Sequence, residues 1–87
     1  DALRQATAEV FEAWIQAATT RLVDAGITPQ ASRDLAILVI AALEGAFVLD
    51  RAMRSTEALQ ATGSAVAAAV QHSLTQHQRP PANTRSR

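Results

Sequence analysis

Apolar residues recur at spacings of three and four along residues 1–25, which is the period of an amphipathic helix. They are Leu3, Val10, Phe11, Trp14, Ala18, Leu22 and Ala25. The polar residues Gln5, Glu9, Glu12 and Gln16 fall on the opposite side. Gly26 follows where a left-handed helix cap is needed, and Ile27 is placed to fold back on Leu22. The pattern predicts a first helix that ends at this glycine.

A second helix is predicted from about residue 29 to residue 54. Thr28 can cap its first amides, and Pro29 suits the first helical position because its missing N–H would be unpaired there. Residues 35–43 are apolar on every side. A helix that is apolar all round must be covered all round, and two neighbouring helices cover only part of it. We therefore expect a partner to cover the rest.

One stripe of this second helix consists of small residues, namely Ala41, Gly45 and Ala52, with Val48 between them. Small side chains four residues apart let another helix approach closely. A glycine inside a helix costs about 1 kcal/mol relative to alanine, so Gly45 requires a reason. Close packing against another helix is the reason we expect.

A third helix is predicted from about residue 56 to residue 78. Ser55 and Thr56 offer a hydroxyl cap, and Glu57 suits the positive end of the helix dipole. Spacings of four and three give a narrow seam typical of helical bundles. The seam consists of Leu59, Gly63, Val66, Val70, Leu74 and His77. Residues 79–87 are polar, basic and proline-bearing, and we expect a disordered tail there.

The fold class that follows is all-α, with one domain over residues 1–78. The 87 residues contain 42 apolar ones, but 20 of these are alanine, which buries little area. A chain this short buries only about 60% of its unfolded surface. Because the first residue is Asp1 and already belongs to a helical pattern, we expect the chain to be a fragment of a longer protein.

Charge and composition exclude several classes of protein. The net charge is zero, whereas a nucleic-acid-binding domain usually has a basic excess. There is no cysteine, so disulfides and thiolate metal sites are excluded. The longest apolar run is too short to span a bilayer, and the polar side of the first helix is acidic, so no membrane partner is expected.

No catalytic constellation or cofactor motif is present. His72 and His77 lie five residues apart, about 140° around a helix, so they cannot share a metal without help. No nucleophile–base pair, paired acids or phosphate loop occurs. We expect neither an enzyme, nor a metal, nor a cofactor.

Glu44 follows nine apolar or small residues in the middle of the second helix. A buried carboxylate is costly unless it is paired. One interpretation is an ion pair with Arg33, with Arg51 or with an arginine from elsewhere at the edge of an interface. The other is a polar anchor in a ligand cavity. Phe11, Trp14 and Phe47 likewise suit either a core or a ligand wall.

The order of these motifs resembles the C-terminal region of TetR/AcrR-family regulators, in particular the branch named for the LmrA and YxaF repressors. The resemblance covers about residues 8–72. It is carried by Phe11-x-x-Trp14, Leu22-x-x-Ala25-Gly26, Leu43-Glu44-Gly45-Ala46, Arg51-Ala52-x-Arg54-Ser55 and Leu59. The Leu-Glu-Gly-Ala step followed by Ala-x-Arg-Ser is the most specific part.

The resemblance implies a cytoplasmic bacterial repressor that works as a homodimer. Residues 29–54 and 56–78 would form a four-helix bundle with the same helices of a second subunit. A small apolar effector would bind beside them and release operator DNA, which contacts only an N-terminal domain absent from this chain. The alternative is a helical homodimeric interaction or adaptor module with no ligand and no DNA role.

Two sets of site residues follow as expectations. The expected effector pocket consists of Phe11, Trp14, Leu38, Glu44 and Phe47. The expected dimer interface consists of Leu38, Ala41, Gly45, Val48, Ala52, Leu59, Gly63, Val66, Val70 and Leu74.

Overall fold

A computed structural model describes residues 1–78 of the chain, with His77 and Gln78 described by their backbone alone. The described part consists of three helices and contains no strand: α1 (Ala2–Asp24), α2 (Pro29–Met53) and α3 (Glu57–Gln78). The predicted all-α class is confirmed, and each predicted helix ends within one or two residues of the observed one. The predicted tail, 79–87, lies outside the described residues.

The turn between α1 and α2 is built as the sequence predicts. Gly26 has a φ of 110°, the left-handed region that a side chain rarely adopts. The amide of Gly26 donates to the carbonyl of Val23 (2.9 Å), and the amide of Ile27 donates to that of Leu22 (3.1 Å). This pair of bonds is the Schellman motif, which satisfies carbonyls at the end of a helix. Ile27 is 2% exposed, so the turn also supplies a core residue.

The start of α2 is fixed by two hydroxyl groups. The Thr28 side chain accepts a hydrogen bond from the amide of Ala31, with Pro29 at the first helical position, as predicted. Ser32 is fully buried one turn later, and its hydroxyl donates to the carbonyl of Ile27 (3.2 Å). The buried serine is thus paired within the turn, which locks the start of α2 against the cap of α1.

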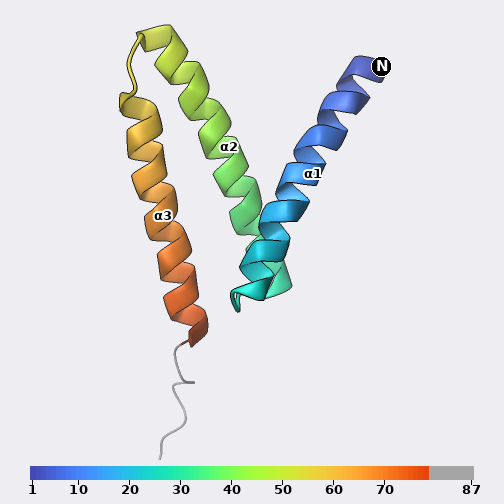
Figure 1. The fold of residues 1–87 in the computed structure, drawn as a ribbon, viewed down its shortest axis with the longest axis vertical. Helices are drawn as coiled ribbons and strands as arrows, with labels where there is room; N and C mark the ends of the chain where they lie inside the picture. Colours follow the sequence, from blue (N-terminus) through green and yellow to red (C-terminus); the bar gives the residue numbers. More distant parts are fainter. Residues whose placement is uncertain (79–87) are drawn as a thin grey trace, which may run out of the picture.

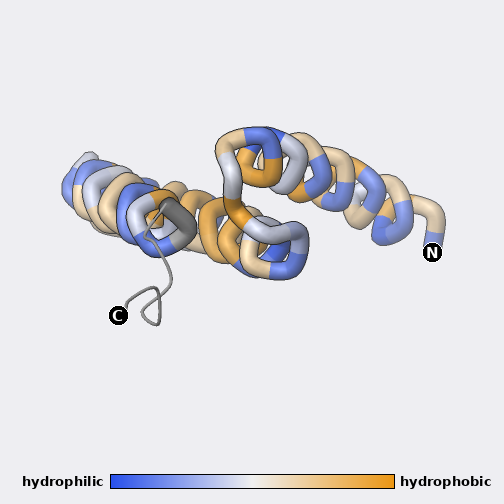
Figure 2. The backbone as a smooth tube through the Cα atoms, turned by 90° about the horizontal axis from the view of Figure 1, so that it is seen from below, coloured by the Kyte–Doolittle hydropathy of each residue, from blue (hydrophilic) through white to orange (hydrophobic). Residues whose placement is uncertain are grey.

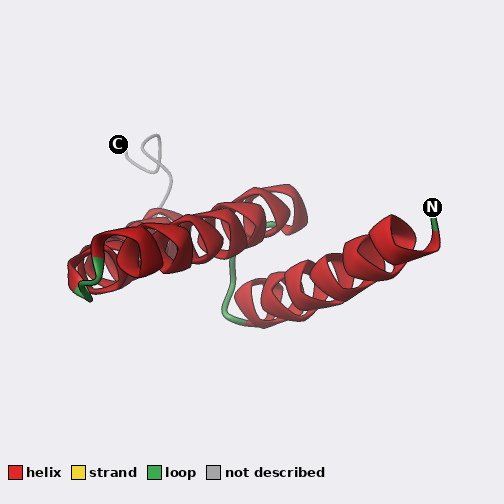
Figure 3. Cartoon of the chain, turned by 90° about the horizontal axis from the view of Figure 1, so that it is seen from above, coloured by secondary structure: helices red, strands yellow, loops and turns green. Residues whose placement is uncertain are grey.

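The helices form an open arrangement (Figure 1). α1 packs against α2 near the turn that joins them, and its N-terminal part diverges from α2. α3 runs back along α2 on the other side, and within residues 1–78 it makes no packing contact with α1. Seen from above, α1 lies to one side of the α2–α3 pair (Figure 3). α2 is therefore the central helix, with one neighbour on each flank.

The buried core is small and lies mostly near the α1–α2 turn. The buried apolar residues are Ile27, Leu35, Ala36 and Ala46. Residues 1–10 of α1 are exposed throughout. Hydrophobic positions occur along all three helices (Figure 2). The large exposed apolar residues of α2 are Ile37, Leu38, Phe47, Val48, Leu49 and Met53. The prediction that the other two helices cover only part of α2 is confirmed.

Candidate functional site

An exposed side of α2 carries the predicted small stripe. We call this surface the uncovered face and define it as Leu38, Ala41, Gly45, Val48 and Ala52. All five residues are exposed, with Val48 exposed to 67%. At 100° per residue they fall within an arc of about 80° around the helix axis. The uncovered face is therefore a continuous apolar strip of mostly small side chains along the middle of α2.

Gly45 has no packing reason within residues 1–78. A Cβ atom built at Gly45 would meet no atom within 4 Å beyond its own helix. Because a glycine inside a helix costs about 1 kcal/mol, the close approach expected from the sequence is not to α1 or α3. The uncovered face is where another molecule could make that approach.

The predicted seam of α3 is used within the chain. Leu59, Val66, Val70 and Leu74 are all half-buried. α2 is the only described helix that packs on α3, so their burial comes from α2. Gly63, by contrast, is exposed, and a Cβ there would also meet open space. The role of these five residues in a dimer remains a prediction. Four of them already bury part of their side-chain surface against α2.

An apolar hollow of about 170 Å³ lies between α2 and α3. Leu38 and Ala42 line it from α2, and Thr62, Ala65 and Val66 line it from α3. Because Leu38 also belongs to the uncovered face, this face continues across the hollow onto the alanine side of α3. Sequence reasoning did not single out Ala42, Thr62 or Ala65 as site residues, since only the packing of the two helices brings them together.

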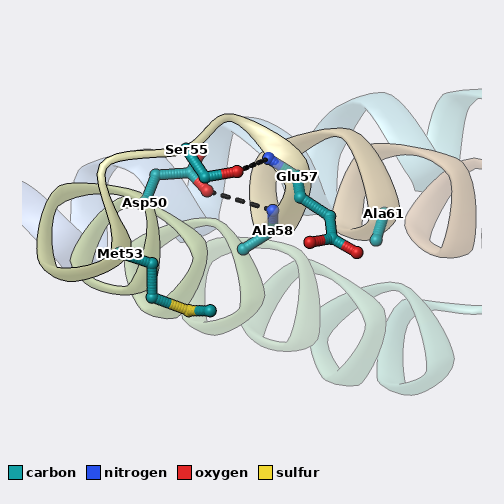
Figure 4. A pocket seen from close by; sticks show the side chains of 6 residues that line it. All are labelled: Asp50, Met53, Ser55, Glu57, Ala58 and Ala61. Atoms are coloured by element: carbon teal, nitrogen blue, oxygen red, sulfur yellow. Dashed lines mark hydrogen bonds between the residues drawn. The ribbon is translucent and has the colours of Figure 1, made fainter.

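The α2–α3 turn is held by Asp50, near the end of α2. Its carboxylate accepts hydrogen bonds from the amides of Ala58 (3.0 Å) and Leu59 (3.2 Å) in the first turn of α3. The Ser55 hydroxyl accepts from the amide of Glu57, as the predicted hydroxyl cap requires (Figure 4). Asp50 was missed by sequence reasoning because it acts across eight or nine residues rather than from the usual cap position.

A second hollow, of about 230 Å³, lies beside this turn (Figure 4). It is lined by Asp50, Met53, Ser55, Glu57, Ala58 and Ala61. The Asp50 carboxylate at its edge already accepts two amide hydrogen bonds, so it has a structural role there. None of the predicted pocket residues lines this hollow.

The predicted pocket residues are divided between α1 and α2. Phe11 and Trp14 pack edge to face, with ring centroids 5.4 Å apart and planes at 89°, an arrangement that aromatic pairs favour. Phe47 of α2 is 53% exposed. It continues a stripe of helical spacing that starts at the fully buried Ala36 and passes through the half-buried Ile40 and Leu43. Exposure thus rises along α2 in the direction in which α1 diverges (Figure 1).

Glu12 forms an ion pair with α2, although the sequence pattern placed it on the polar side of α1. Arg33 of α2 donates two hydrogen bonds to its carboxylate, at 2.7 and 2.9 Å. The hydrogen bonds from Arg33, more than its charge, hold the pKa of Glu12 below its ordinary value, against a smaller opposing effect of desolvation. The expectation of an Arg33–Glu44 pair is therefore wrong, because Arg33 is engaged by Glu12.

Glu44 lies on the surface of α2 and not within a covered segment of the chain. Within the described residues it forms no ion pair with Arg51 either, since the Arg33–Glu12 pair is the one that this part of the chain contains. If Glu44 has a charged partner, that partner lies outside the described part of the chain.

A family model described as "Transcriptional regulator LmrA/YxaF-like, C-terminal domain" matches residues 1–65. The chain belongs to this family. Among curated proteins and among solved structures, no match to the chain was found. The family places the chain among the C-terminal domains of TetR-type regulators, which in general dimerise and bind effectors and are not enzymes. The resemblance identified from the motifs is thus confirmed.

The LmrA/YxaF-like match covers α1, α2 and the first part of α3. It therefore includes all five predicted pocket residues and the whole uncovered face. Three of the predicted interface residues, Val66, Val70 and Leu74, lie beyond the matched range.

The remaining features of this LmrA/YxaF-like domain concern metal binding, the histidines and membrane spanning. Among the side chains of residues 1–76, no three acidic, histidine or cysteine groups gather closely enough to hold a metal ion. His72 is exposed, and its Nε2 lies 3.4 Å from Nε2 of Gln76 in the next turn. The side chain of His77 lies outside the described residues. None of the described helices combines the length and the apolar character that a membrane crossing requires.

Proposed function

We propose that this LmrA/YxaF-like domain is the dimerising and effector-sensing part of a bacterial TetR-family transcriptional repressor. The observation that carries the proposal is the uncovered face of α2. Burying apolar surface contributes about 25 cal/mol per Å², and no described helix covers this strip. A second copy of the chain would cover it, with α2 and α3 of both subunits forming a four-helix bundle.

The effector site in this proposal lies where α1 and α2 diverge. Pockets for small molecules are mostly apolar and aromatic, with few polar groups. Phe11 and Trp14 on α1 and Phe47 on α2 supply aromatic surface on the two diverging helices. Leu38, which was predicted to join them, lies half a turn around α2 from Phe47 and lines the hollow beside α3 instead. The half-buried and exposed members of the α2 stripe suit a small apolar effector. The rest of the pocket would come from the parent protein.

The regulatory step follows from population shift. An effector changes a conformational equilibrium only if it binds one state better than the other. In the parent repressor, which we place in the cytoplasm, the effector would favour a state whose N-terminal domains no longer fit operator DNA. This chain would contribute the dimer axis and one wall of the effector site.

The test is to replace Gly45 with leucine and measure the dissociation constant of the dimer by analytical ultracentrifugation. Because a Cβ at this position meets no other described helix within 4 Å, Gly45→Leu should leave the helical content intact. Forcing bulk into a close helix crossing costs roughly 2 kcal/mol, which corresponds to about thirtyfold weaker association.

The matched control is Ala17→Leu, which adds similar bulk at an exposed position of α1. It should leave the dissociation constant unchanged. Equal association of wild type, Gly45→Leu and Ala17→Leu would contradict a dimer built on the uncovered face.

A further inference from the structure

Two opposite charges flank the uncovered face of α2 on the same edge. Glu44 and Arg51 are both exposed, and neither forms an ion pair within residues 1–78. They lie seven residues apart, which is about 20° short of two full helical turns. Relative to Val48 they are offset by about 40° and 60° in the same direction. The two charges therefore lie one above the other beside a strip of small apolar residues.

We propose that these charges set the register of the dimer, with Glu44 of each subunit paired to Arg51 of the partner subunit. The inference rests on the proposed function, because it takes a second copy of this chain as the occupant of the uncovered face. Two identical helices that pair antiparallel about a two-fold axis bring the same edge of each helix together. A residue that precedes the midpoint of one helix then faces the residue that follows the midpoint by the same number of positions in the partner helix.

The spacing of the charges fixes where that axis lies. The midpoint between Glu44 and Arg51 falls between residues 47 and 48. With a rise of 1.5 Å per residue, each charge lies about 5 Å from the midpoint along the helix. Glu44 of one subunit and Arg51 of the partner subunit then lie at the same height, and the reverse pair lies on the other side of the axis.

The small residues fit the same register. With the axis at this midpoint, Ala52 of the partner subunit lies at a height midway between Ala41 and Gly45. Val48 of the partner subunit lies between Gly45 and Val48. Side chains of one helix thus enter the spaces between those of the other, as helix packing requires. The charges and the small stripe, which are separate features of the sequence, select one register.

A parallel arrangement would lose this complementarity. A two-fold axis along the helices brings opposite edges together, so Glu44 and Arg51 would face the edge that carries Leu38 and Leu49. Two charges per subunit would then lie against apolar side chains without partners, which is unfavourable. The geometry therefore assigns Glu44 to the interface rather than to an effector pocket.

The experiment is a charge exchange between the two positions, measured as the dissociation constant by analytical ultracentrifugation at about 0.1 M salt. Glu44→Arg places like charges opposite each other twice in the homodimer, and so does Arg51→Glu. Each single variant should dimerise about tenfold more weakly than wild type, given the modest strength of exposed pairs. Far-UV circular dichroism checks that each variant stays helical.

Rescue is the decisive measurement. A one-to-one mixture of Glu44→Arg with Arg51→Glu restores both opposite-charge pairs in the heterodimer, so the mixture should associate nearly as tightly as wild type. The double variant, which carries both changes in one chain, should regain its homodimer for the same reason. Matched controls are Arg4→Glu and Glu9→Arg, which change exposed charges on α1 and should leave association unchanged.

The possible outcomes separate the two proposals. Weakened single variants with rescue by the mixture and by the double variant support the register. A wild-type dimer whose single variants associate normally, or whose mixture shows no rescue, overturns the register and leaves the proposed dimer in place. A wild-type chain that stays monomeric overturns both.

Discussion

Removal of the Asp50 carboxylate should loosen the α2–α3 pair, because this one side chain caps the start of α3 from the end of α2. In Asp50→Ala the amides of Ala58 and Leu59 lose their acceptors at 3.0 and 3.2 Å. Loss of a capping side chain costs roughly 0.5–2 kcal/mol, and loss of a negative charge at a helix N-terminus adds about 0.3–1 kcal/mol. We expect the free energy of unfolding to fall by about 2 kcal/mol.

The assay is thermal unfolding followed by circular dichroism at equal chain concentration, since association shifts an apparent Tm. For a chain of this size, 2 kcal/mol corresponds to a fall in Tm of about 10 °C. Asp50→Asn keeps an acceptor without the charge and should lose about half as much. Asp34→Ala is the matched control, because Asp34 is exposed and accepts a single side-chain hydrogen bond from Gln30. A Tm for Asp50→Ala equal to that of Asp34→Ala would refute the capping role.

Two further predictions concern the α1–α2 junction. The carboxyl of Glu12, followed by NMR as the pH is lowered, should titrate with a pKa below the ordinary value of a glutamate, because Arg33 donates two hydrogen bonds to the ionised form. Because the pKa of Glu12 is lower in the folded state than in the unfolded state, the pair with Arg33 stabilises the fold fully at pH values above the unfolded-state pKa. This stabilisation is lost as the pH falls through the folded-state pKa. A Glu12 carboxyl with an unshifted pKa would contradict the pairing. Ile27→Ala should lower the free energy of unfolding by about 2–4 kcal/mol in urea titrations, because Ile27 is 2% exposed. A loss below about 0.5 kcal/mol would show that the turn contributes no core.

Features governed by neighbouring residues were predictable from the sequence. Gly26 closes α1 and Thr28 with Pro29 opens α2, because these local conformations depend on a few adjacent residues. The exposed apolar surface of α2 was also predictable, since residues 35–43 are apolar on every side and two neighbours cannot surround a helix.

Features that join distant residues were not predictable. The Glu12–Arg33 pair depends on how α1 crosses α2, and helical periodicity alone placed Glu12 on the solvent side. The capping role of Asp50 depends on the path of the α2–α3 turn. The sequence suggested Leu59 and Val66 as part of a dimer seam, which stays a prediction, but it did not show that both residues are half-buried against α2. In each case the sequence identifies a residue's chemistry, and only the packing identifies its partner.

The most direct test of a shared bundle is the solution mass of this chain, measured by size-exclusion chromatography with light scattering. We predict a particle near twice the chain mass of 9.2 kDa, because a second copy of the chain would bury the uncovered face of α2 away from water. A well-folded particle at 9.2 kDa would contradict the dimer and, with it, the physical basis of the repressor assignment.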